Sequence, residues 1–421
     1  MSLAATTRRV LLLASLGLAV ASPTRAQVYT VLYTFQGKSD GALPLAGLIQ
    51  DPAGNLYGTT AGDFYKNPQT GTTEGSIFEL KSDGKFALLH NFGAGGPGGA
   101  SLTGGLVRDS AGNLYGAAYE GGTSDTACFS AGCGVVFKLD TKAEFSVLHS
   151  FSGNADCRDG CQPLSPLNLD AAGNLYGATY IGGSRNCNLG RREFGQNSDC
   201  GVVFKLDATG KETVLRSFGN GRKDGDNPNP GLFMDAAGNL YGTTYGGGPV
   251  GHDYPGAGTV FKLDTEGNET VVHFFSWFVD GAEPAAGLIQ DASGNFYGTT
   301  DWTFTHVFKL DPLGNVTLLG VGGYSLGPLV MDSVGNLYGT SADGGSNPAC
   351  TVDGGCGFVY KLDPLGEETV LYSFGGGSDG YYPYGGVIID ASGNLYGTAA
   401  YGGATSKVCP SGCGAVFKIT P

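Results

Sequence analysis

One set of carboxylates in this 421-residue sequence belongs to an Asp-Gly-x-x-Pro pattern that occurs five times. Five carboxylates gathered at one site would attract a cation such as Ca²⁺, or a basic ligand. Alternatively, each Asp accepts hydrogen bonds from the backbone of its own turn, and we favour this interpretation. The five residues are Asp40, Asp159, Asp224, Asp280 and Asp379.

Both tryptophans of the chain stand beside phenylalanines. Trp277 is followed by Phe278, and Trp302 and Phe304 occur together further along the chain. An exposed cluster of these four rings would suit stacking against sugar rings or contact with a protein partner. The alternative, which we favour, is a local hydrophobic plug.

The histidines offer little support for catalysis. His90, His149 and His273 occupy one repeated sequence position, and we interpret them as structural because a catalytic His is not usually repeated. His252 and His306 have no obvious carboxylate partner in the sequence. The chain also lacks a nucleophile elbow, a phosphate-binding loop and a His-Glu-x-x-His pattern. Apart from the possible Ca²⁺ site, we predict no catalytic residue, no metal ligand and no cofactor.

The ten cysteines form five pairs of near neighbours, with none left over. In an exported protein this argues for five local disulfides. The pairs lack the Cys-x-x-Cys spacing and nearby His residues that are typical of a zinc site. The predicted disulfides join Cys128 to Cys133, Cys157 to Cys161, Cys187 to Cys200, Cys350 to Cys356 and Cys409 to Cys413.

A repeat defines the elements that must position these residues. The motif Gly-Asn-Leu-Tyr-Gly, with Phe for Leu in one copy, occurs seven times together with three further signatures. Each signature is typical of a short strand, because β-branched and aromatic residues alternate with smaller or polar ones between turn residues. We name them strand A (Gly-Leu-x-x-Asp), strand B (Asn-Leu-Tyr-Gly-Thr), strand C (Val-Phe-Lys-Leu) and strand D (Thr-Val-Leu-x-x-Phe). The first motif begins at Gly54, Gly112, Gly173, Gly238, Gly294, Gly335 and Gly393.

Seven repeats of four antiparallel strands predict an all-β fold, a seven-bladed β-propeller. The two ends of the repeat array indicate a closed ring. The first strand, at 29–35, has the D signature, and the last strand, at 414–419, has the C signature. We therefore expect the N-terminal strand to complete the last blade, whereas an open solenoid would need capping units.

The repeat pattern GNLYGTT…GG…G.VFKLD…G…TVL.SF resembles the GloVer tandem repeat of exported bacterial proteins. Its A–B portion is also similar to NHL-type propeller repeats. The resemblance covers nearly all of the chain after residue 26. It implies export and a propeller fold, and it implies no established activity and no catalytic residues.

The N-terminus has the features of a signal peptide. Arg8 and Arg9 precede an apolar run at 10–21, which is too short to span a bilayer, and a small-residue cleavage site ends at Ala26. We predict a signal peptide at 1–26 and one propeller domain at 27–421. The protein is expected to be a secreted or periplasmic monomer without a membrane span.

The charge of the chain argues against nucleic-acid binding. Its formal net charge is −14, and residues 1–26 contain three Arg and no acidic residue, so the remainder carries −17. Such a chain lacks the positive surface that nucleic acids require.

Strand direction sorts the loops into two faces. The B–C and D–A loops share one face, which we call the loop face, and the A–B and C–D turns share the other. The B–C loops vary most in length, and all five cysteine pairs fall on the loop face. Because variable loops on a rigid scaffold often carry function, we favour a non-enzymatic, exported protein that binds a glycan or a protein there. The alternatives are a polysaccharide lyase or hydrolase and a structural cell-envelope protein.

Overall fold

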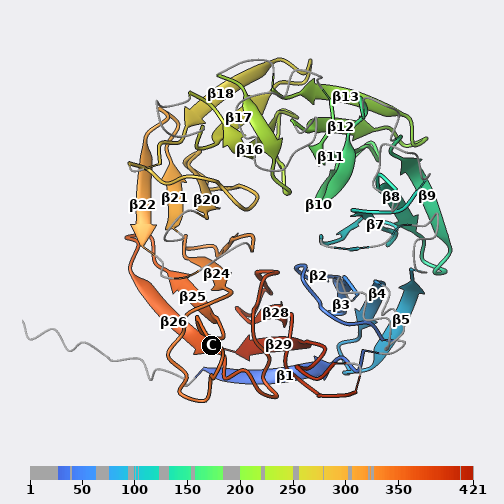
Figure 1. The fold of residues 1–421 in the computed structure, drawn as a ribbon, viewed down its shortest axis with the longest axis vertical. Coiled ribbons are helices and arrows are strands. Elements are labelled where there is room, and N and C mark those ends of the chain that lie inside the picture. Colours follow the sequence, from blue (N-terminus) through green and yellow to red (C-terminus); the bar gives the residue numbers. More distant parts are fainter. Residues whose placement is uncertain are drawn as a thin grey trace, which may run out of the picture.

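The computed structural model describes most of the chain after the predicted signal peptide. Every regular element in the described part is a β-strand, and these strands form seven antiparallel sheets arranged in a ring (Figure 1). The described residues are 27–37, 40–62, 75–92, 99, 101–102, 104–122, 132–152, 157–183, 200–219, 223–249, 256–277, 279–301, 306–320, 323, 327–407 and 409–420. The prediction of a seven-bladed propeller is confirmed.

Each blade runs from an A strand near the axis of the ring to a D strand at the rim (Figure 1). Blade 1 contains β2 (Ile49–Gln50), β3 (Leu56–Thr60), β4 (Ser76–Leu80) and β5 (Phe86–Asn91). Blade 2 contains β6 (Val107–Arg108), β7 (Leu114–Ala118), β8 (Val135–Leu139) and β9 (Phe145–Ser150). Blade 3 contains β10 (Cys161–Leu169), β11 (Leu175–Ile181), β12 (Val202–Leu206) and β13 (Glu212–Ser217).

The remaining blades follow the same plan, except that two short strands share the A position of blade 4. Blade 4 contains β14 (Gly225–Pro228), β15 (Phe233–Met234), β16 (Leu240–Gly247), β17 (Thr259–Leu263) and β18 (Glu269–Phe274). Blade 5 contains β19 (Ile289–Gln290), β20 (Phe296–Thr300), β21 (His306–Leu310) and β22 (Val316–Gly320). Blade 6 contains β23 (Val330–Met331), β24 (Leu337–Ser341), β25 (Phe358–Leu362) and β26 (Glu368–Ser373).

Blade 7 joins the two ends of the chain. It contains β27 (Val387–Ile389), β28 (Leu395–Ala399), β29 (Ala415–Thr420) and the N-terminal β1 (Val28–Thr34). Strand β1 pairs antiparallel with β29, from Val28 opposite Thr420 to Thr34 opposite Ala415. The prediction that the N-terminal strand closes the ring is therefore confirmed.

The A–B turn explains why the Asp-x-x-Gly-Asn-Leu-Tyr sequence is repeated. In blade 1, Gly54 adopts a φ of 83° and donates its N–H to the Asp51 carbonyl at 3.0 Å. The Asp51 carboxylate accepts hydrogen bonds from the backbone and the side chain of Asn55, and from the Tyr57 hydroxyl. This Tyr-to-Asp hydrogen bond recurs in all seven blades, so the B-strand tyrosines have a structural role.

Phenylalanines join most of the blades to one another. The D-strand Phe of one blade packs against the C-strand Phe of the next, with ring centroids 5.0–5.4 Å apart. The pairs are Phe35–Phe78, Phe92–Phe137, Phe151–Phe204, Phe218–Phe261, Phe275–Phe308 and Phe374–Phe417. All of these rings are buried, so the core lies between the sheets as well as within them.

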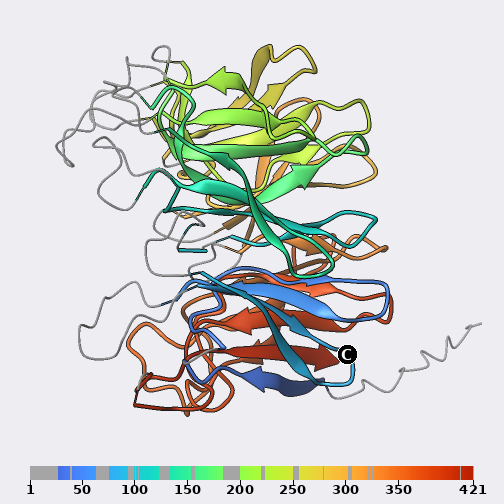
Figure 2. The ribbon, with the colours of Figure 1, turned by 90° about the vertical axis from the view of Figure 1, so that its right-hand side faces the viewer.

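The loops leave the sheets on two sides of the ring (Figure 2). The B–C and D–A loops lie on one side, and the short A–B and C–D turns lie on the other. In the described part of the chain, no helix is long and apolar enough to cross a membrane.

Candidate functional site

The five aspartates of the Asp-Gly-x-x-Pro pattern lie in the D–A loops that follow five different D strands. Asp40 accepts hydrogen bonds from the Tyr33 hydroxyl at 3.0 Å and from the Gln36 N–H at 2.8 Å. Asp379 is held in the same way by the Tyr372 hydroxyl and by a backbone N–H.

The other three aspartates follow the same plan with different donors. Asp280 lies 2.7 Å from the His273 Nε2, Asp224 accepts from Arg216 at 2.9 Å, and Asp159 accepts from the Ser152 backbone and hydroxyl. These contacts give each carboxylate a role in positioning its own D–A loop. Ca²⁺ or ligand binding by the five stays a prediction.

A strained backbone position recurs three residues after these aspartates. Leu43, Gln162, Asn227, Glu283 and Tyr382 all adopt φ values between 53° and 59°, and each precedes a proline. The N–H of each residue donates across to a backbone carbonyl on the preceding blade, as from Tyr382 to Cys356 at 3.1 Å. A positive φ costs a non-Gly residue about 1–3 kcal/mol and clusters at functional sites.

The side chains at this position are not repeated, although the backbone is. One chain carries Leu, Gln, Asn, Glu and Tyr at equivalent points of the D–A loops. Of these side chains, Glu283 is buried, with 6% exposure, and Leu43 packs against a hydrophobic core. In the sequence, the positive-φ residue is the one directly before the proline in each Asp-Gly-x-x-Pro copy. The sequence analysis did not single out this position.

Four tyrosines form the largest described aromatic group on the loop face, and we call them the tyrosine cluster. They are Tyr381, Tyr382, Tyr384 and Tyr401. The first three lie in the D–A loop before β27, and the fourth follows β28 in the B–C loop. The rings of Tyr381 and Tyr401 stack at 5.3 Å and 19°, and their backbones exchange two hydrogen bonds. All four side chains are partly exposed.

The hydroxyls of Tyr381 and Tyr384 remain protonated at neutral pH. Burial, followed by the neighbouring tyrosines and Asp343, raises the pKa of Tyr384 to about 12. Burial also raises the pKa of Tyr381. The cluster therefore presents apolar ring faces together with hydroxyl groups that can donate hydrogen bonds.

Two disulfides border the tyrosine cluster. Cys350 is bonded to Cys356, whose carbonyl accepts the Tyr382 N–H, and Cys409 is bonded to Cys413 in the loop that follows Tyr401. Both pairs are bonded as the sequence predicts. The second restrains the loop that carries Tyr401, and the first restrains the blade 6 loop to which Tyr382 is hydrogen-bonded, which lowers the entropy cost of binding.

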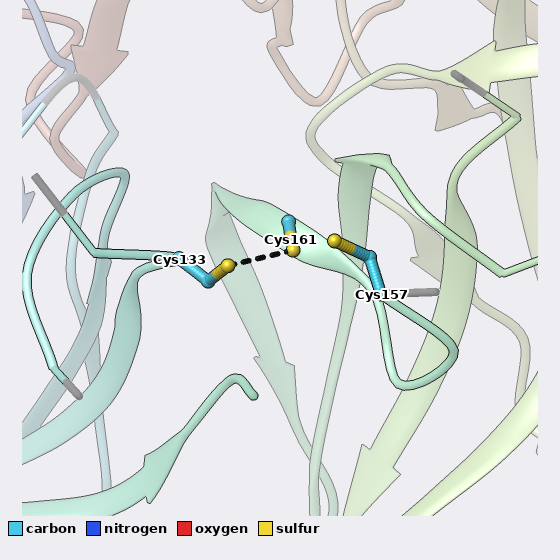
Figure 3. Close-up of side chains that lie close together, drawn as sticks. All are labelled: Cys133, Cys157 and Cys161. Atoms are coloured by element: carbon cyan, nitrogen blue, oxygen red, sulfur yellow. Dashed lines mark hydrogen bonds between the residues drawn. The ribbon is translucent and has the colours of Figure 1, made fainter. Parts of the chain in front are cut away.

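Three of the remaining cysteines, Cys133, Cys157 and Cys161, lie close together near the start of blade 3, with their Sγ atoms within 4.8 Å of one another (Figure 3). Cys133 and Cys200 are disulfide-bonded, and their predicted partners, Cys128 and Cys187, lie outside the described residues. The structure has no bond between Cys157 and Cys161, and the Sγ atom of Cys161 lies 2.9 Å from that of Cys133.

Of the four aromatic residues in the tryptophan prediction, the structure describes Trp277 alone. Trp277 is half-buried and packs against the hydrophobic core that blades 4 and 5 share. This contact fits the interpretation as a hydrophobic plug. Phe278, Trp302 and Phe304 lie outside the described residues, as does His252. A binding site at these aromatic residues stays a prediction.

Comparison with known proteins agrees with the fold. The family model of the Gloeobacter/Verrucomicrobia repeat matches residues 15–189 and 130–321. No curated protein matches the chain. Together with the seven repeated sheets, the match defines a tandem-repeat β-propeller. The chain belongs to the Gloeobacter/Verrucomicrobia repeat family.

The backbones of solved structures also align with that of this chain. The extracellular domain described for a hybrid two-component system of B. thetaiotaomicron aligns with a TM-score of 0.54 at 12% identity, over 93% of this chain. This chain spans 41% of that structure's length. A luciferin-regenerating enzyme aligns over 94% of this chain and 95% of its own, with a TM-score of 0.44 at 11% identity. At such identities the likeness concerns the fold alone.

Proposed function

We propose that this protein is an exported, non-enzymatic propeller that binds a glycan at the tyrosine cluster of its loop face. The observation that carries the proposal is the group of four partly exposed tyrosines on two adjacent loops. Export is supported by the N-terminal signal features and by disulfides, which persist in oxidising compartments.

The chemistry of the cluster suits a sugar. Pyranose rings have apolar C–H faces that pack on aromatic rings, and their hydroxyls exchange hydrogen bonds with phenol groups. Because one disulfide restrains the loop of Tyr401 and the other restrains the loop that Tyr382 is hydrogen-bonded to, less ordering is needed when a ligand binds. The strained backbone at Tyr382 fixes the direction of one ring in the unbound protein.

An oligosaccharide array with the chain beginning at Gln27 tests the proposal. We expect binding to a defined group of oligosaccharides. In titrations with the best of them, Tyr381→Ala and Tyr401→Ala should each weaken binding roughly tenfold, or about 1.4 kcal/mol.

Leu365→Ala is the matched control. Leu365 is 86% exposed and lies in the C–D turn of blade 6, on the opposite face, so its loss should leave affinity unchanged. Tyr381→Phe keeps the ring and removes the hydroxyl, which separates stacking from hydrogen bonding. Binding that survives both Ala substitutions would exclude the tyrosine cluster as the site.

A further inference from the structure

A second polar cluster lies between blades 2 and 3, away from the tyrosine cluster. His149 comes from β9, Asp159 from the following D–A loop, and Glu212 from the start of β13. One ligand atom from each residue lies within 4.8 Å of the other two, and the His149 Nε2 is 3.4 Å from a Glu212 oxygen. Tetrahedral ligands at zinc lie about 3.4 Å apart, given bonds of about 2.1 Å.

The atoms of this cluster are buried and partly unpaired. Asp159 Oδ2 accepts hydrogen bonds from Ser152, which orients the carboxylate and leaves Oδ1 without a partner. The His149 Nε2 and the Glu212 Oε1 are also buried without a hydrogen bond. The Glu212 side chain is only 12% exposed. Buried polar atoms normally have partners, so these atoms are available as ligands for a cation.

At the interface between blades 3 and 4, an arginine lies beside the equivalent pair of carboxylates. There Arg216, Asp224 and Glu269 occupy the positions of His149, Asp159 and Glu212. The Arg216 guanidinium contacts Asp224 at 2.9 Å and Glu269 at 2.5 Å. The two interfaces therefore share a pair of carboxylates, and at the second of them an arginine contacts both.

Among the residues that the structure describes, the other interfaces contain no such carboxylate pair. At the corresponding place Tyr33 stacks on Phe86, His90 stacks on Phe145, and Tyr372 stacks on Tyr29. Ring stacking between the D strands of neighbouring blades therefore recurs in this repeat. The replacement of a ring by Glu212 removes the stacking contact and adds a buried acid, which favours a ligand at this interface.

We infer that His149, Asp159 and Glu212 bind a divalent transition-metal ion of the zinc class, which supplies the charge that Arg216 supplies one blade later. The donor set is one imidazole nitrogen and two carboxylate oxygens, which suits Zn²⁺ and its neighbours better than Ca²⁺, a cation that takes oxygen ligands. The ion would pin the D–A loop before β10 to the neighbouring blade. Its role is structural.

Isothermal titration of the EDTA-treated protein with ZnCl₂ tests the inference. We expect one ion per chain and a rise in the thermal midpoint. His149→Arg copies the neighbouring interface, so it should fold and should weaken Zn²⁺ binding at least about tenfold. Glu212→Gln should weaken binding similarly, and circular dichroism establishes that each variant is folded.

The reciprocal substitution makes the test stricter. Arg216→His should create a second site beside Asp224 and Glu269, so the stoichiometry should rise from one ion to two. The sulfurs of Cys133, Cys157 and Cys161 also lie within 4.8 Å of one another, so these cysteines are a competing candidate for a metal site. Prior alkylation of thiols excludes this competing site. Zn²⁺ binding that persists in His149→Arg, or that is lost only on alkylation, would overturn the inference, as would no binding to the wild type.

Discussion

At the scale of single residues, the repeated glycine of strand B makes room for a buried ring. A Cβ added to Gly58 would lie 2.5 Å from the Phe78 ring and 2.8 Å from Leu48. Both neighbours are buried, with at most 3% exposure, so neither can move aside into solvent. The same contact with a C-strand Phe recurs at Gly116, Gly177, Gly242, Gly298 and Gly397.

Gly58→Ala should therefore lower the free energy of unfolding by about 1–3 kcal/mol, which is typical of overpacking. Urea unfolding followed by fluorescence measures the change. Gly320→Ala is the matched control, because a Cβ there meets nothing within 4 Å. Its effect should be within about 0.5 kcal/mol. Equal losses in both variants would show that the Phe78 contact is not the cause.

At the scale of elements, the strand β1 connects three blades of the ring. It carries Tyr29, which stacks on Tyr372 of blade 6, and Tyr33, which stacks on Phe86 of blade 1. Phe35 follows directly and is fully buried. One strand thus completes a sheet and contacts both neighbouring blades.

Deletion of 27–36 should destabilise the ring by more than about 5 kcal/mol, because each buried aromatic ring contributes about 3–5 kcal/mol. We expect an unfolded or self-associating chain in thermal unfolding and size-exclusion chromatography. A chain beginning at Gln27 serves as the control and should be folded. A monomeric deletion variant with an unchanged thermal midpoint would contradict the closure argument.

At the scale of the whole molecule, seven equivalent carboxylates respond to acid together. Burial opposes the ionisation of the A–B turn aspartates, but hydrogen bonds from the following Asn outweigh it, and the pKa of each Asp is lowered. A group whose pKa is lower in the folded state stabilises the fold when it is ionised. This stabilisation is complete above the unfolded pKa of about 3.9 and is lost as pH falls through the folded value.

The thermal midpoint should therefore fall steeply below about pH 4, with seven turns contributing in parallel. Calorimetry between pH 2.5 and pH 7 measures the slope. Asp51→Asn should reduce the midpoint at pH 7 and make the acid dependence shallower, because one titrating turn is removed. A midpoint that stays constant through pH 3 would contradict this account.

The repeat made most of the architecture predictable before any coordinates. Gly-Asn-Leu-Tyr-Gly identified strand B, and the unmatched D strand at 29–35 identified the closing contact. The bonds of Cys350 with Cys356 and Cys409 with Cys413 were also predictable, because partners so close in sequence meet within one loop. The pairing of Cys157 with Cys161 is not formed in the structure, where Cys133 of the neighbouring blade also lies beside Cys161.

The sequence by itself therefore determined the number of blades, their strands and the closure of the ring, because these depend on local periodicity and phase. Only the tertiary structure decided which unrepeated side chains meet. Tyr381 reaches Tyr401 across two loops, and His149 faces Glu212 across two blades. The physical reason is that packing between blades sets these distances, and the spacing of residues along one strand carries no information about the neighbouring sheet.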